Sequence, residues 1–329
     1  MFELLVSNRL LRRVVTLPAL FAVSTLVTIT APLWITGVFV TDLLRSPRRR
    51  PLTRLGLFGW AWCLTECAGV LAAFGLWLSG RSRDHAAHYR LMAWWAGRLM
   101  RHMTHAMQIK IEVVGAESLA GGRAVVMSRH ASLADSLVSA WVICTCNGLW
   151  PRYVLKRELI LDPCLDVVGL RVPNHFVHRG AADSAGDLQA LRALAATVDD
   201  RSIAVIFPEG TRSSPEKRRR ALDAIKRRDP ERAERVGGLR NLLPIRPSGA
   251  LALLEGAPDA DVIFAWHTGF DGLDTFGGII RMLRYGGDEC RFVMRRVQRC
   301  EVPADVAGWL DGEWARMDGE VTRVLGERQ

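Results

Sequence analysis

A long uncharged run near the N-terminus places the strongest constraint on how this chain can fold. No acidic or basic residue occurs from Val14 to Thr41, and a helix needs only about 20 apolar residues to cross the hydrocarbon core of a bilayer. A second apolar run, from Leu55 to Gly80, contains one charge, at Glu66. The first run is too long for a signal-peptide core, and no clear small-residue cleavage site follows it. The sequence therefore predicts a membrane-embedded helical region, residues 1–108, ahead of a globular remainder.

Arginine clusters surround both apolar runs and leave two arrangements open. Basic residues favour the cytoplasmic face of a membrane, and one cluster lies between the two runs. If each run crosses the bilayer, this middle cluster lies on the face opposite the globular part. If both runs enter a single leaflet, with a break near Ala31-Pro32, every cluster stays on the cytoplasmic face. We expect the globular part to face the cytoplasm, at a bacterial inner membrane or its equivalent. The arginines are Arg9, Arg12, Arg13, Arg45, Arg48, Arg49, Arg50, Arg54, Arg81, Arg83 and Arg90.

The stretch His85–Met107 predicts an interfacial helix that leads into the globular part. It mixes large apolar side chains, including Trp94 and Trp95, with arginines and histidines, as amphipathic helices at a bilayer surface do. Its two His-x-x-His pairs lack the cysteines or carboxylates that complete a metal site. We interpret these histidines as surface residues and predict no metal site. They are His85, His88, His102 and His105.

From about residue 109 the sequence alternates short β-branched runs with helical stretches. This alternation predicts an α/β domain over residues 109–329, with a central, mostly buried sheet flanked by helices. The predicted strands are Ile109–Val114, Ala124–Met127, Tyr153–Leu155, Ile203–Phe207, Asp261–Trp266 and Arg291–Val297. The predicted helices are Ala134–Val142, Ser184–Thr197, Pro215–Arg235 and Val306–Leu325.

The string Ser128–Asp135 follows a predicted strand and opens a predicted helix. Active sites in α/β sheets often lie at such junctions. His130 and Asp135 are separated by four residues, so a turn can bring their side chains together. The carboxylate would hold one imidazole nitrogen while the other faces a substrate as general base. The string therefore predicts a catalytic His–Asp pair.

The same string has a structural interpretation. Ser132 and Asp135 have the spacing of a capping box, in which Ser132 caps the helix and Asp135 reaches back to it. We expect that one carboxylate cannot fully serve both roles. On this string alone, catalysis and capping both remain open.

A second polar loop follows the predicted strand Ile203–Phe207. It places a carboxylate, a flexible glycine, a hydroxyl and a guanidinium on one tight turn, at Glu209, Gly210, Thr211 and Arg212. Arg212 offers a bidentate fork and Thr211 a hydroxyl donor, which together suit an oxyanion. Taken alone, the loop could equally be a structural turn with a surface ion pair.

Together these strings resemble the glycerophospholipid acyltransferase family, which includes the 1-acylglycerol-3-phosphate acyltransferases. The predicted His–Asp pair matches the family's His-x-x-x-x-Asp block, and residues 209–212 match its Glu-Gly-Thr-Arg block. Between them, the segment Phe176–Arg179 resembles a family run that ends in Arg, and Leu242–Gly249 resembles the Leu-Pro block that follows. Many members have Asn before the catalytic His, where this chain has Arg129.

The resemblance implies an enzyme that transfers a fatty acyl group directly from a thioester to the free hydroxyl of a lysophospholipid. The donor is acyl-CoA or acyl carrier protein, and the leading acceptor is 1-acyl-sn-glycerol 3-phosphate, which would give phosphatidate. No Gly-x-Ser-x-Gly nucleophile elbow is present, which agrees with transfer without an acyl-enzyme. No cofactor is expected beyond the thioester co-substrate.

The resemblance also implies roles for individual residues. His130 would be the general base and Asp135 would orient it. Arg212, with Arg179 and Lys156 as further candidates, would hold the acceptor phosphate. Glu209 is expected to bind a glycerol hydroxyl or to brace the nearby arginine. Backbone N–H groups near the Gly210 turn would receive the developing oxyanion.

Basic side chains dominate Pro215–Arg240, and the whole chain has a net charge of +10. One interpretation is a solvated helix with pairs at i and i+4. The other is a collar that binds anionic lipid or a phosphorylated acyl carrier. No known nucleic-acid reader motif accompanies the charge, so we expect an anionic membrane surface as partner and no nucleic acid.

Three other functions stay open. The acceptor could be lysophosphatidylglycerol, lyso-phosphatidylinositol or a lyso-aminolipid. A thioesterase or lipid hydrolase could use the same His–Asp pair to activate water. A noncatalytic membrane-shaping protein would be expected to lose motif residues, yet all of them are present.

Overall fold

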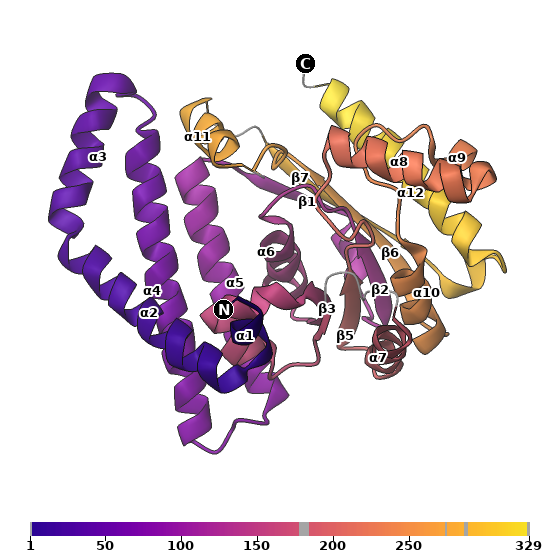
Figure 1. Ribbon diagram of the computed structural model, residues 1–329, viewed down its shortest axis with the longest axis horizontal. Helices are drawn as coiled ribbons and strands as arrows, with labels where there is room; N and C mark the ends of the chain where they lie inside the picture. Colours follow the sequence, from indigo (N-terminus) through magenta and orange to yellow (C-terminus); the bar gives the residue numbers. More distant parts are fainter. Residues whose placement is uncertain (1, 178–183, 274, 286–288, 328–329) are drawn as a thin grey trace.

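The computed structural model describes residues 2–177, 184–273, 275–285 and 289–327. Its N-terminal part is helical, and Figure 1 shows α2, α3 and α4 grouped at one side of the molecule. Two of these helices, α2 and α4, are long and apolar enough to cross a membrane. The bounds are α1 (Phe2–Ser7), α2 (Arg9–Ile29), α3 (Ala31–Arg45), α4 (Pro51–Leu78) and α5 (His85–Met107).

The first apolar run bends at the place where the single-leaflet arrangement required a break. Helix α2 ends at Ile29 and α3 begins at Ala31, with a proline in its first turn, because Pro32 has no N–H to continue the preceding helix. The turn between α3 and α4 is closed by Asp42, which is buried and accepts hydrogen bonds from the backbone N–H groups of Leu52 (3.2 Å) and Thr53 (2.7 Å). These contacts satisfy amides that a helix N-terminus leaves unpaired.

Helix α5 has the predicted bounds but a different environment from the predicted interfacial one. Its buried face includes Ala96, Leu99 and Met100, which belong to the main core beneath the sheet. His88 is also buried, and its Nδ1 lies 2.8 Å from the carbonyl oxygen of Asp84. The interpretation of all four histidines as surface residues was therefore wrong for His88, because α5 is covered by α4 on one side and by the sheet domain on the other.

A seven-stranded sheet forms the centre of the globular part, in the order β1-β7-β6-β2-β5-β3-β4. Neighbouring strands are parallel except for the β6–β7 pair. The two strands β2 and β5 are buried at every position, as expected for a parallel sheet covered on both faces. The bounds are β1 (Ile111–Val114), β2 (Ala124–Ser128), β3 (Trp150–Lys156), β4 (His175–Val177), β5 (Ser202–Ile206), β6 (Asp261–Thr268) and β7 (Cys290–Val297).

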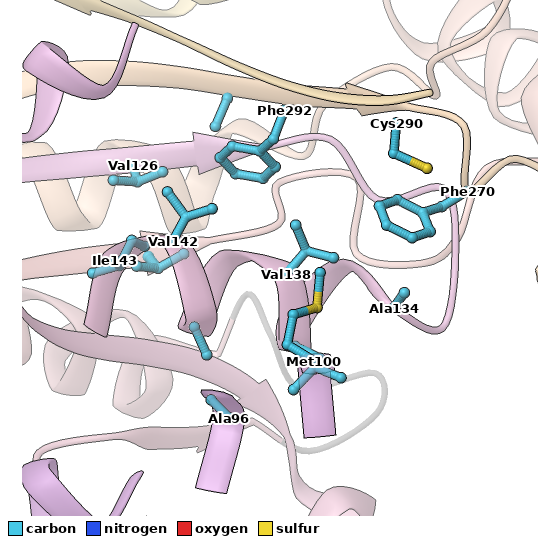
Figure 2. Close-up of a cluster of buried hydrophobic side chains, with 14 of the residues drawn as sticks. Ala96, Met100, Val126, Ala134, Val138, Val142, Ile143, Phe270, Cys290 and Phe292 are labelled. Carbon is cyan, nitrogen blue, oxygen red and sulfur yellow. The ribbon is translucent and has the colours of Figure 1, made fainter. Parts of the chain in front are cut away.

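Helices cover both faces of this sheet (Figure 1). On one face, α5 and α6 pack with side chains of β2 and β7, and Figure 2 shows Met100 and Val138 below Phe292. On the other face, α7, α10 and α12 enclose a second core that contains the buried Trp314. The remaining α-helices are α6 (Asp135–Ala140), α7 (Ala185–Ala196), α8 (Pro215–Arg228), α9 (Pro230–Val236), α10 (Pro247–Gly256), α11 (Phe276–Tyr285) and α12 (Val306–Gly326). Shorter 3₁₀ and π turns are Ala116–Leu119, Trp141–Cys146, Arg157–Leu161, Leu165–Gly169 and Arg299–Glu301.

Two predicted helices need correction, and three elements were not predicted. The single helix Pro215–Arg235 is two helices, because Pro230 cannot continue α8 and Asp229 caps α9 by accepting from the N–H of Arg232. The helix expected at 134–142 ends at Ala140 and continues as a π turn. Strand β4 and helices α10 and α11 were missed, since β4 has three residues and α10 is apolar on most sides.

Candidate active site

The carboxyl ends of three neighbouring parallel strands position the candidate site. Strand β2 lies between β5 and β6, and all three run in the same direction. The loops after β2 and β5 therefore emerge at the same edge of the sheet, where ligand sites of open α/β sheets lie. The first loop carries His130 and Asp135, the second carries Glu209–Arg212, and β6 ends at Thr268.

The structure brings the predicted His–Asp pair together. Nδ1 of His130 lies 2.8 Å from Oδ2 of Asp135, whose side chain is 1% exposed, whereas the imidazole is 17% exposed. A carboxylate only accepts hydrogen bonds, so Nδ1 carries the proton and Nε2 keeps its lone pair. The nitrogen that remains is the one a general base needs.

The turn that follows β2 folds around the carboxylate of Asp135. The backbone N–H groups of Ala131 (2.6 Å) and Ser132 (2.9 Å) donate to Oδ2, and the Ser132 hydroxyl donates to Oδ1. Burial alone would raise the pKa of Asp135. The electrostatic effect of His267 and the hydrogen bonds from His130 and His267 outweigh burial, so the pKa lies well below its ordinary value. The group is therefore an ionised carboxylate.

These contacts change the capping interpretation. The Ser132 hydroxyl accepts from the N–H of Ala134 (3.1 Å), and α6 begins one residue later, at Asp135. The carboxylate of Asp135 reaches back to the N–H of Ser132, as in a capping box. The predicted N-cap at Ser132 was wrong, because the cap residue of α6 is Ala134, without a side-chain cap. One carboxylate nevertheless contacts both the turn and the ring of His130, because each of its two oxygens accepts more than one hydrogen bond.

Glu209 links the two motif loops through their backbones. Its Oε1 accepts from the N–H of His130 (2.7 Å), and its Oε2 accepts from the N–H of Leu243 (2.9 Å). Burial raises the pKa of Glu209 to about 8, although the two N–H donors and Arg129 lower it. The side chain is 2% exposed. Both carboxylate oxygens of Glu209 thus accept from backbone N–H groups.

The loop after β5 also needs its glycine. Gly210 has a φ of +68°, and a Cβ there would lie 3.3 Å from Cδ of Arg246. The N–H of Ser213 donates to the carbonyl oxygen of His130 at 2.8 Å. Thr211 and Arg212 are therefore carried by a loop that is attached to the histidine backbone at Glu209 and again at Ser213.

Arg212 is partly buried, and within the described residues its Nη1 is buried without a hydrogen-bond partner. Its carbonyl oxygen accepts from Nζ of Lys217 at 3.0 Å, and the same ammonium lies 3.4 Å from Oγ1 of Thr211. A guanidinium nitrogen in this state has spare donor capacity toward an anion. No contact to an acid competes for it in the described part of the chain.

Of the other two predicted phosphate ligands, Lys156 lies within the described residues and Arg179 does not. Lys156 is the last residue of β3 and is half-buried. Since β3 is parallel to β5, its carboxyl end lies at the same edge of the sheet as the two motif loops. Arg179 lies outside the described residues, just beyond the end of β4 at Val177.

Two residues at the site were not predicted from the sequence. His267, on β6, is fully buried, and its Nε2 lies 2.8 Å from Oδ1 of Asp135. Arg129 is 3% exposed, donates to the carbonyl oxygen of His267 and pairs with Asp271 at 2.7 Å. In the sequence, Arg129 was noted only as a departure from the family pattern. His267 is 132 positions from Asp135, so only the β2–β6 pairing reveals the contact.

Site and fold together define a class of chemistry. An imidazole that a buried, ionised carboxylate holds at the carboxyl edge of a mostly parallel sheet is suited to take a proton from a weakly acidic group. A partly buried guanidinium with spare donor capacity is carried by the adjoining loop.

Comparisons with known proteins find a family match over part of the chain. Residues 110–246 match the family model described as Acyltransferase, and this range includes both motif loops. The resemblance drawn from the motif blocks is thus confirmed, and the chain carries an acyltransferase domain. The crystal structure of the 1-acyl-sn-glycerophosphate acyltransferase PlsC from Thermotoga maritima is similar with a TM-score of 0.46 and 13% identity, over 80% of this chain and 97% of that one. No curated relative matches the chain in sequence.

Proposed function

We propose that this protein is a membrane-bound O-acyltransferase that moves a fatty acyl group from a thioester to the free hydroxyl of a lysophospholipid. The leading acceptor is 1-acyl-sn-glycerol 3-phosphate, and the donor is acyl-CoA or acyl carrier protein. One observation carries the proposal: the His130–Asp135 hydrogen bond of 2.8 Å lies inside the region that matches the acyltransferase family.

In the proposed reaction, Nε2 of His130 removes the proton of the acceptor hydroxyl while its oxygen attacks the thioester carbonyl carbon. An alcohol is too weakly acidic to ionise beforehand, so proton removal and attack are coupled. Asp135 holds the Nδ1 proton and stabilises the imidazolium that forms. Collapse of the tetrahedral intermediate breaks the C–S bond, and the imidazolium returns the proton to the leaving thiolate. The products are an ester and a free thiol.

The contacts of Ser132 favour direct transfer. Ser128 and Ser132 each lie two positions from the histidine in sequence, and each is 1% exposed. The Ser132 hydroxyl donates to Asp135 and accepts from the N–H of Ala134. A serine in these contacts cannot approach a thioester, so it does not supply the nucleophile of an acyl-enzyme.

Arg212 is the proposed ligand of the acceptor phosphate. Its buried Nη1 has no partner in the described chain, and a guanidinium fork matches the geometry of a phosphate. Lys156, at the same edge of the sheet, and Arg179, whose position is not described, are proposed as further ligands. Holding the phosphate would align the acceptor hydroxyl with the general base, which supplies much of the rate of such reactions.

The N-terminal helices support membrane attachment of the enzyme. Large side chains on α2, α3 and α4 are exposed, among them Leu26 at 63%, Leu33 at 77% and Phe74 at 53%. So many exposed apolar side chains on adjacent helices are unfavourable in water but favourable in the hydrocarbon core of a bilayer. Helix α8, which follows the Arg212 loop, adds a basic surface that suits anionic lipid or an anionic acyl donor.

A membrane assay with defined substrates tests the proposal. Membranes that contain the wild-type chain or His130→Ala would receive a panel of lysophospholipids with each thioester donor, and the products would be resolved by mass. We expect a diacyl lipid that requires both substrates and the wild-type chain. Free fatty acid that forms without lysolipid would instead identify a thioesterase.

A further inference from the structure

We propose that His267 is a positioning residue of the transfer reaction, which holds Asp135 from the side opposite His130. The inference rests on the proposed function, because it concerns how the general base of that reaction is oriented. Its starting point is geometric. Two imidazoles contact one carboxylate, with Nδ1 of His130 at 2.8 Å from Oδ2 and Nε2 of His267 at 2.8 Å from Oδ1.

The protonation of His267 follows from its contacts. Asp135 is ionised and can only accept, so Nε2 of His267 carries a proton. Its Nδ1 is buried and has no hydrogen-bond partner within the described residues. His267 therefore directs an Nε2–H at the carboxylate, while Arg129 donates to the backbone carbonyl oxygen of the same residue.

The position of His267 excludes direct contact with substrate. Its side chain is 0% exposed, and its ring packs edge-on against Phe270 with centroids 5.5 Å apart. It can act on the reaction only through Asp135. A side chain kept solely for packing would leave no buried nitrogen unpaired at this place, since an unsatisfied buried polar atom destabilises the fold.

His267 supplies the only side-chain donor that reaches Asp135 from a strand, among the residues that the structure describes. The other donors belong to His130 and to the turn at Ala131 and Ser132. A turn can shift with its own carboxylate, whereas β6 is fixed in the sheet by β2 and β7. The Nε2–H of His267 thus fixes the carboxylate against the sheet. By donating a hydrogen bond to Oδ1, it also limits how strongly the carboxylate attracts the imidazolium of His130.

The charged groups around His130 define what a pH measurement reports. Asp135 faces its ring from α6, and Glu209 accepts from its backbone N–H. Arg129 precedes it and is paired with Asp271 from the loop after β6. Burial raises the pKa of Glu209 to about 8, so this group also titrates in the measured range. All four groups are present in the wild type and in every variant, so a difference between their pH profiles reports the lost donor to Asp135.

The experiment compares three variants with the wild type in membranes. His267→Leu removes the donor, His267→Gln keeps an N–H near the place of Nε2, and His267→Asn has an amide too short to reach Asp135. We expect His267→Leu and His267→Asn to lower kcat ~10- to 100-fold. The KM values for the acceptor and the thioester should stay within about twofold of the wild type. The acidic limb of kcat/KM should move to higher pH, because the imidazolium is better stabilised when the carboxylate has one donor fewer. His267→Gln should have most of the wild-type kcat and the acidic limb of the wild-type pH profile.

A matched control separates positioning from folding. His88 is another buried histidine, bonded to a backbone carbonyl far from the site, so His88→Leu should lower stability without moving the pH profile. If His267→Leu does not fold, the inference is tested by comparing the kcat and pH profile of His267→Gln with those of His267→Asn. If His267→Asn has the kcat of the wild type and the same acidic limb of the pH profile, the inference is overturned. The proposed function is then unaffected, because the wild type still transfers the acyl group. Absence of transfer in the wild type would overturn the proposed function instead.

Discussion

At the scale of residues, the site is organised around the carboxylate of Asp135. It accepts from two imidazoles, two backbone N–H groups and a hydroxyl. So many donors keep the group ionised in a buried position, where an unpaired carboxylate would take up a proton. The partly exposed His130 and the buried Asp135 therefore have different sensitivities to mutation.

The histidine can be removed with little effect on the fold. In His130→Ala we expect turnover to fall at least ~100-fold, because only substrate positioning and oxyanion stabilisation remain. The backbone contacts of residue 130 with Glu209 and Ser213 do not involve the ring. Expression, membrane insertion and thermal unfolding in detergent should thus match the wild type. A variant that retains more than a tenth of wild-type turnover would exclude His130 as the base.

The aspartate contacts both the histidine and the turn, so we expect it to contribute to catalysis and to stability. Asp135→Asn replaces one acceptor oxygen by an amide N–H, which faces existing donors. We expect both a ~10- to 100-fold loss of kcat and a destabilisation of ~1–3 kcal/mol, the range for a buried unsatisfied polar group. Asp187→Asn is the control, since Asp187 also pairs with a histidine, His175, but near the surface. Lost stability with full activity per folded molecule would leave Asp135 only its structural role.

Arg212 is assigned to binding and not to proton transfer. Arg212→Lys keeps the charge but loses the fork, so apparent affinity for lysophosphatidate should weaken by ~1–3 kcal/mol, or ~5- to 150-fold. The KM of the thioester should change much less. Arg219→Lys, at an exposed position of α8, is the matched control. Kinetics with each substrate varied at saturating co-substrate would test this, and an unchanged acceptor KM would remove Arg212 from the site.

At the scale of elements, a buried ion pair attaches the first apolar helix to the globular part. Asp166, in the turn Leu165–Gly169, is fully buried and pairs with Arg12 at 2.6 Å and Arg13 at 2.7 Å. Arg12 is itself 2% exposed. The basic residues at the start of α2 were predicted only as charges that flank a membrane segment. Two of them hold α2 against the domain.

This attachment can be measured. Asp166→Asn leaves a buried arginine without its counter-charge, and removal of one partner from a buried pair destabilises by ~3–5 kcal/mol. We expect a lower unfolding temperature in detergent and faster proteolysis within α2. Glu216→Gln removes an exposed pair with Arg220 and should change stability by at most ~1 kcal/mol. Equal stability of Asp166→Asn and wild type would show that α2 is held mainly by apolar contacts.

At the scale of the whole molecule, the buried Glu209 makes stability depend on pH. The pKa of this carboxyl is raised by burial from 4.5 to about 8, so the folded protein keeps its proton where the unfolded chain has lost it. Stability should therefore fall as pH rises from about 4.5 to about 8. Glu209→Gln cannot titrate and should lack this slope. The free energy of unfolding of the wild type and of Glu209→Gln would be measured from pH 5 to pH 8. The wild type should lose stability relative to the variant as pH rises, and a constant difference between the two would contradict the raised pKa.

The sequence alone predicted much of the molecule where the causes are local. The uncharged run, the break at Ala31-Pro32 and the buried strands β2 and β5 follow from composition and periodicity. The contact of His130 with Asp135 spans one turn, so spacing was enough to predict it. The break between α8 and α9 at Asp229-Pro230 also has a local cause, although the sequence analysis predicted a single helix there.

Only the tertiary structure decided the contacts that cross strands. His267 reaches Asp135 because β2 and β6 are neighbours in the sheet, and Glu209 joins His130 to Leu243 because three loops meet at one edge. Helix α5 became part of the core because the sheet domain covers its apolar face. Periodicity identifies which side of a helix is apolar, but the partner that buries it is set by the packing of distant segments.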